Sequence, residues 1–157
     1  MNQIPLYLAN NFIEWGQRNG VEITPLKLQK LLYLYYARFC YTQNARPFED
    51  CFEKWKRGPV VPSIYHATKH YGAHPLSPLY DTDGTIGRIR STSEPFRTIF
   101  EDVVQKFGKK TAHQLVNLTH GDGVFDYQTA WEKAQDGQRL STKDIQQDGE
   151  VLFRAMD

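Results

Sequence analysis

The stretch ITPLKLQKLLYLYYARF, residues 23–39, decides the fold predicted for this chain of 157 residues. Thr24 can cap the free amides of a helix start, and Pro25 has the fixed φ angle that suits the first helical position. Apolar residues cover much of the circumference of the predicted helix, so we expect it to be central to the domain. Its strongest apolar face is formed by Leu28, Leu31, Leu32, Tyr35 and Phe39.

Further helices are expected on both sides of this stretch. Each has apolar residues at a spacing of three or four, and most begin at a capping residue or a proline. The predicted segments are 5–18, the central helix, a helix from Pro62 or Ser63 to 71, 93–107 with Ser93 as cap, 111–118 with Thr111 as cap, a helix containing Tyr127 and Trp131 that ends near 137, and a last helix that begins at Ser141 or Thr142 and extends to 153.

Two short segments are expected to be extended. Asp83-Gly84 lies between two short apolar stretches, 79–80 and 86–89, and this pattern predicts a β-hairpin. One short strand is also expected across 51–56. A Gly-Asp-Gly sequence at 121–123 predicts a turn. The fold class that follows is mainly α: a compact single domain, 1–157, with about six helices in a bundle and a small β-hairpin or short strands in the middle.

The composition excludes several classes of protein. Nineteen basic and eighteen acidic residues give a net charge of +1, without the basic excess of a dedicated nucleic-acid binder. Cys40 and Cys51 are too few for a disulfide framework or a structural zinc site. Neither a transmembrane stretch nor a secretion signal is recognisable, so we expect a cytoplasmic protein.

The histidines are the best candidates for chemistry, and they do not form a motif. His66, His70 and His74 are spaced four apart, as metal ligands on a helix can be, but no glutamate base lies between them. We interpret them as a polar helix face. Nucleophile motifs and phosphate-binding loops are also missing. We therefore expect no catalytic residues, no metal and no cofactor, and a protein that is not an enzyme.

The stretch WKRGPVVPSIY, residues 55–65, predicts a rigid loop. Gly58 permits backbone shapes that other residues resist, while Pro59 and Pro62 fix φ on either side. It can be a structural corner, with Trp55 anchored inward, or a preorganised contact surface that binds at low entropic cost. A mixture of the two, with the basic residues outward, is the interpretation we favour.

Together these motifs resemble a known family. The run 23–39 followed by FEKWKRGPVVPSIY, 52–65, is similar to the Panacea domain, also called the SocA-like antitoxin domain, to which prophage proteins named GepA also belong. Thr119-His120 resembles the family's Thr-His element, although the step from there to Trp131 is longer than usual. The resemblance extends from the first helix to about Trp131.

The resemblance implies an antitoxin that neutralises a cognate toxin by direct protein binding. An alternative that it also implies is an adaptor that delivers a toxin to the ClpXP protease. A metal-dependent hydrolase and a DNA-binding repressor are the remaining, weaker hypotheses. The partners expected are therefore a toxin protein, with a ClpXP-type protease as the alternative, and no small-molecule substrate, membrane or nucleic acid.

Several polar residues of the two motifs are predicted to contact the partner. Those on the central helix and in the rigid loop neither pack nor cap in the predicted scheme, so we expect them to be available at the surface. Leu28, Leu32 and Trp55 are expected to be buried together instead. The full predicted protein-binding set is Lys27, Gln29, Lys30, Trp55, Lys56, Arg57, Gly58, Pro59, Val60, Tyr65 and His120.

Overall fold

The computed structural model describes residues 3–121 and 128–156, and it is mainly α-helical, as predicted. Within these residues the helices are accompanied by one small antiparallel hairpin, and short 3-10 turns follow α3 and α7. The elements are α1 (Ile4–Asn19), α2 (Pro25–Gln43), β1 (Glu53–Trp55), β2 (Gly58–Val60), α3 (Pro62–Thr68), α4 (Phe96–Phe107), α5 (Ala112–His120), α6 (Ala130–Lys133) and α7 (Thr142–Leu152).

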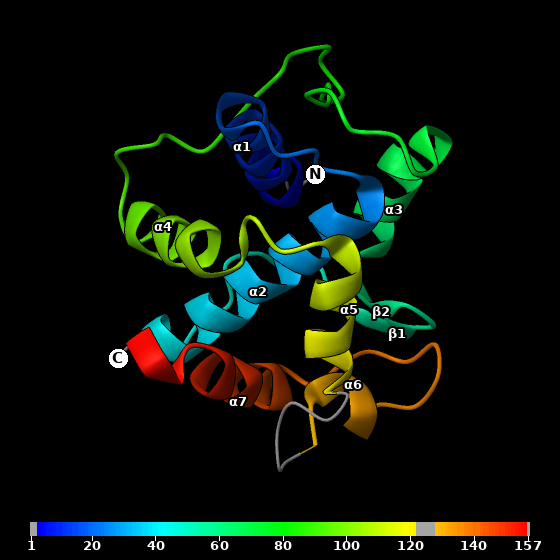
Figure 1. Ribbon diagram of the computed structural model, residues 1–157, viewed down its shortest axis with the longest axis vertical. Coiled ribbons are helices and arrows are strands. Elements are labelled where there is room, and N and C mark those ends of the chain that lie inside the picture. Colours follow the sequence, from blue (N-terminus) through cyan, green and yellow to red (C-terminus); the bar gives the residue numbers. More distant parts are fainter. Residues whose placement is uncertain (1–2, 122–127, 157) are drawn as a thin grey trace.

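Helix α2 is the centre of the domain, which confirms the expectation from its apolar sequence. Figure 1 shows α1, α4, α5 and α7 arranged around it, with the hairpin at its side. Every residue from Lys27 to Arg38 is buried. The Thr24 hydroxyl accepts a hydrogen bond from the Lys27 amide at 3.3 Å, so the predicted cap is present.

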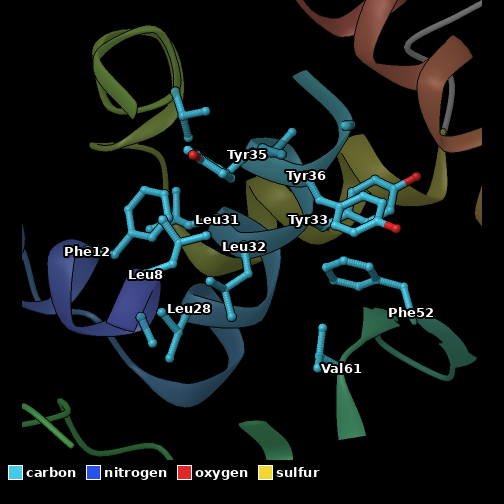
Figure 2. Packing of buried hydrophobic residues seen from close by; sticks show 14 of the residues in the cluster. Leu8, Phe12, Leu28, Leu31, Leu32, Tyr33, Tyr35, Tyr36, Phe52 and Val61 are labelled. Atoms are coloured by element: carbon cyan, nitrogen blue, oxygen red, sulfur yellow. The ribbon is translucent and has the colours of Figure 1, made fainter. Parts of the chain in front are cut away.

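The core is rich in aromatic rings that meet edge to face. Phe52 packs against Tyr33 and Tyr36, at ring-centroid distances of 5.1 and 5.2 Å (Figure 2). Leu28 and Leu32 are fully buried, as predicted. The prediction that Trp55 is buried with them was wrong, because Phe52 takes the place over α2 and Trp55 is only half-buried.

Helices α2 and α7 approach closely enough to require a glycine. A Cβ atom on Gly149 would lie 2.0 Å from the carbonyl oxygen of Ala37, which no side chain can tolerate. The adjacent Asp148 is buried; its carboxylate accepts a hydrogen bond from the Tyr33 hydroxyl and another from the Ala130 amide. This buried carboxylate therefore ties α2, α6 and α7 together.

The predicted β-hairpin around Asp83-Gly84 is not formed, and this prediction was wrong. A tight turn is present, with the Asp81 carboxylate accepting the amides of Asp83 and Thr85. The flanking segments do not pair with each other because two side chains of α1 take their backbone groups. Asn10 bonds Leu79 and Gly87 in this way, and Asn11 bonds both backbone groups of Ile89.

The hairpin lies instead at β1 and β2, where only one strand was expected. The predicted cap at Thr111 is confirmed, and Ser141 rather than Thr142 caps the last helix, whereas α4 begins at Phe96 without a cap from Ser93. Tyr127 and most of the predicted 121–123 turn lie outside the described residues. No helix in the described ranges has both the length and the apolar character needed to cross a bilayer.

Candidate protein-binding site

The hairpin presents two cations at a sharp turn. Trp55 pairs with Gly58 in the antiparallel register, so Lys56 and Arg57 form the two-residue connection. Both are exposed, and we call them the hairpin tip. Gly58 has a φ of +117°, a conformation that residues with a side chain rarely adopt. The predicted role of this glycine in shaping the loop is therefore confirmed.

The base of the hairpin is held by two neighbouring side chains of α2. The Gln29 amide group donates to the carbonyl oxygen of Val61 at 3.1 Å and accepts from its N–H at 2.9 Å. The Lys30 Nζ donates to the carbonyl oxygen of Pro59 at 2.7 Å. We call these contacts the buried clasp. Because it bonds backbone rather than side-chain atoms, the clasp fixes the path of the chain beyond the hairpin tip.

Lys30 is the most unusual member of the clasp, because its side chain is 0% exposed. Burial lowers the pKa of its amine to about 7, since the charged form loses its water. A Cβ atom on Gly58 would lie only 2.8 Å from Nζ and 3.1 Å from the hydroxyl oxygen of Thr119. The absence of a side chain at residue 58 therefore leaves the space that the lysine occupies.

The expected exposure of Lys27, Gln29 and Lys30 was wrong. All three are buried, and the last two satisfy backbone groups of the hairpin and of the start of α3. Polar side chains on a central helix are stable there only when hydrogen-bonded or when their charge reaches the surface. Their role as partner contacts stays a prediction, and their buried side chains offer little surface to a partner.

The remaining residues of the predicted protein-binding set also divide into buried and exposed ones. Gly58, Pro59 and Val60, which also belong to the predicted protein-binding set, are buried. Side-chain surface remains at Trp55, Lys56, Arg57, Tyr65 and His120. The exposed part of the predicted set is therefore the tip and the rings beside it.

Two aromatic residues flank the tip. The Trp55 ring meets Tyr65 of α3 edge to face, with ring centroids 4.8 Å apart. Its indole N–H donates to the Glu53 carboxylate at 3.0 Å, which fixes the ring orientation. Tyr65 is 39% exposed. Trp55 and Tyr65 are thus held in place, yet they keep accessible surface next to the tip.

On the other side of β1, Trp131 of α6 brings His120 to the site. The two rings are stacked, with centroids 3.8 Å apart and an interplanar angle of 13°. The indole N–H of Trp131 donates to the carbonyl oxygen of Trp55 at 2.8 Å, and the Lys54 ammonium lies 4.2 Å from its ring centroid. Trp131 therefore joins α5, α6 and the hairpin.

Sequence reasoning missed Lys54 and the contact role of Trp131. Together with Trp55 and Lys56 they line an open hollow of about 570 Å³ beside the hairpin. Lys54 directly precedes Trp55 in the sequence, so a basic residue beside this tryptophan was visible there. No sequence spacing could have placed Trp131 there.

The site offers cations and aromatic surface, which suit the recognition of a protein. In the ranges 3–121 and 128–156, no three His, Cys, Asp or Glu side chains gather as metal ligands would. His66 and His70 are both exposed on α3 and its 3-10 extension. Lysine and arginine at a rigid tip can make ion pairs and charge-assisted hydrogen bonds to carboxylates.

Comparison with known proteins points to one family. The family model described as "Antitoxin SocA-like, Panacea domain" matches residues 28–124, which include the clasp, the hairpin and α5. Antitoxin SocA of Caulobacter vibrioides is 29% identical over 121 residues, covering 74% of this chain and 64% of that protein. The chain thus spans less than two thirds of this relative's length. No solved structure matches the chain.

Proposed function

This chain belongs to the SocA-like antitoxin family of Panacea-domain proteins, and from that premise we propose that it neutralises a cognate toxin by binding it directly. In this proposal the protein acts as a binding partner rather than as a catalyst, and the two proteins meet in the cytoplasm. The relative named above is itself called an antitoxin, which supports the general role.

The observation that carries the proposal is the contrast between a fixed hairpin base and an exposed cationic tip. The buried clasp and the Trp131 indole hold the hairpin from two sides. A surface that is already ordered loses little conformational entropy when a partner binds. The tip is therefore suited to a tight contact even though it is small.

Arg57 is the residue that we expect to contribute most to binding. Its guanidinium group is planar and can form two parallel hydrogen bonds to one carboxylate, whereas the Lys56 ammonium acts as a point charge. Tryptophan, tyrosine and arginine are also the residues most often found at energetic hot spots. Trp55 and Tyr65 supply the first two types beside Arg57.

The test is co-expression with a toxin candidate, for which the adjacent open reading frame is the first choice. We expect that gene to stop growth alone, that this chain restores growth, and that the two proteins copurify from cells with and without the ClpXP protease. The adaptor would be favoured, and neutralisation by direct binding contradicted, if the two proteins do not copurify and the rescue of growth disappears in cells that lack ClpXP. Failure of rescue would contradict the antitoxin role.

A further inference from the structure

A second feature of the surface is unrelated to the hairpin: a groove that runs along both sides of Trp15, between α1 and α4. Two hollows, of about 460 and 700 Å³, share Trp15, Glu101 and Val104 in their walls. Figure 1 shows α1 and α4 on one side of α2 and the hairpin on the other. We call this feature the Trp15 groove, and the antitoxin proposal does not use it.

The floor of the groove is apolar and closely packed. Phe100 of α4 packs on Phe12 and on Phe96, with centroids 4.7 and 5.1 Å apart, and keeps part of its surface exposed. The Trp15 ring lies against the end of α4, where a Cβ atom on Gly108 would come within 2.4 Å of it. A half-buried tryptophan that its surroundings hold in place is a typical anchor for a partner's apolar side chain.

The rim of the groove concentrates positive charge. Six cationic and two acidic side chains line the two hollows, a net of +4, whereas the whole chain carries only +1. The rest of the chain is therefore net negative, at −3. The cations are Arg18, Arg88, Arg97, Lys106, Lys109 and Lys110.

Only some of these cations are already engaged. Arg88 makes a two-point contact with Glu14 at 2.8 and 2.9 Å, and Lys106 donates to the carbonyl oxygen of Leu152. Within the described residues, no carboxylate lies within ion-pair distance of Arg18, Lys109 or Lys110, and all three are exposed. The three are therefore available to an anionic partner.

We propose that the Trp15 groove binds an acidic amphipathic helix of a partner protein. Apolar side chains of that helix would lie on Trp15 and Val104, and its carboxylates would face Arg18 and the Lys109–Lys110 pair. Grooves between helices with an apolar floor commonly receive an amphipathic helix in this way. A nucleic acid fits less well, because its phosphates would leave the apolar floor uncovered.

The test uses a fluorescein-labelled helical peptide of about 18 residues, roughly five turns. One face carries leucines and the flanks carry glutamates; a control peptide has lysine at each glutamate, and a DNA duplex of similar length is the third probe. Fluorescence anisotropy measures binding at about 150 mM salt, where weak surface attraction is screened. We expect saturable binding of the acidic peptide, and of neither other probe.

Two double variants with equal changes in charge locate the binding surface. The groove variant Arg18→Glu with Lys109→Glu should weaken acidic-peptide binding about tenfold or more, while the tip variant Lys56→Glu with Arg57→Glu should bind like the unmodified chain. Lys109→Ala with Lys110→Ala is a milder groove variant in case the first fails to fold. No saturable binding, equal binding of the lysine peptide or the DNA, or a larger loss from the tip variant would each overturn the proposal.

Discussion

The hairpin base and the hairpin tip carry the same kind of residue in opposite environments. Lys30, in the base, is fully buried and donates to a backbone carbonyl. Lys56, at the tip, is exposed beside Arg57. One lysine holds the loop and the other is available to a partner. The difference shows that a polar residue in a family motif need not be a contact residue, because it can fix the shape of one.

The largest loss of stability is expected from a substitution in the hydrophobic core next to the hairpin base. Leu32 is fully buried on α2, so Leu32→Ala should lower the free energy of unfolding by ~2–5 kcal/mol, through lost burial and the cavity left behind. Chemical denaturation measures it. A loss below about 1 kcal/mol would show that this face of α2 is exposed and would remove the contrast between base and tip.

The next largest loss of stability is expected where Lys30 of the hairpin base packs against Gly58. Gly58→Ala places a Cβ atom 2.8 Å from the Lys30 Nζ, in a backbone conformation that is already strained for alanine. We expect a loss of ~1–3 kcal/mol in the free energy of unfolding. Gly84→Ala is the matched control, because Gly84 also has a positive φ but has open space around it. Equal losses would mean that Lys30 does not occupy the space under Gly58.

A smaller change in the free energy of unfolding should follow from a change in pH, because Lys30 titrates. The pKa of Lys30 is lowered to about 7 by burial, so above pH 7 the unfolded state binds more protons than the folded state. Stability from this group therefore rises with pH, by ~1–2 kcal/mol between about pH 7 and 8.5. Lys30→Met should remove that rise, and urea denaturation of both proteins at several pH values measures it.

Comparing the unmodified chain with Lys30→Met isolates the contribution of Lys30 to the pH dependence of stability. Burial raises the pKa of Cys40 to about 12, which lowers stability at alkaline pH, but this contribution is present in both proteins. Parallel pH profiles for the unmodified chain and Lys30→Met would contradict the burial of the amine.

Local rules were enough to predict most of the helices and the identity of the rigid loop. The caps at Thr24, Thr111 and Ser141 follow from short-range chemistry that the sequence shows directly. The hairpin was placed wrongly because Asn10 and Asn11, some seventy residues away, bond the segment that was expected to pair with itself. Such long-range side-chain contacts leave no local pattern in the sequence.

The candidate site was predicted only in part, because tertiary contacts that leave no local sequence pattern decide which of its residues are exposed. Lys56 and Arg57 are exposed, as the loop chemistry indicated, but the polar residues of α2 are turned inward. A helix covered on all sides buries its polar residues too, and the hydrophobic pattern alone does not reveal which backbone groups they will satisfy. The stacking of His120 on Trp131 also depends on tertiary contacts.

The double variant Lys56→Glu with Arg57→Glu tests the central claim most directly, with melting temperature and rescue from the toxin measured on the same protein. Neither residue is buried, so stability should change by less than about 0.5 kcal/mol. Lys143→Glu, an exposed change on α7, is the control and should alter neither property. We expect a folded double variant that no longer rescues growth. A folded double variant that still rescues growth would contradict the claim that the hairpin tip binds the toxin.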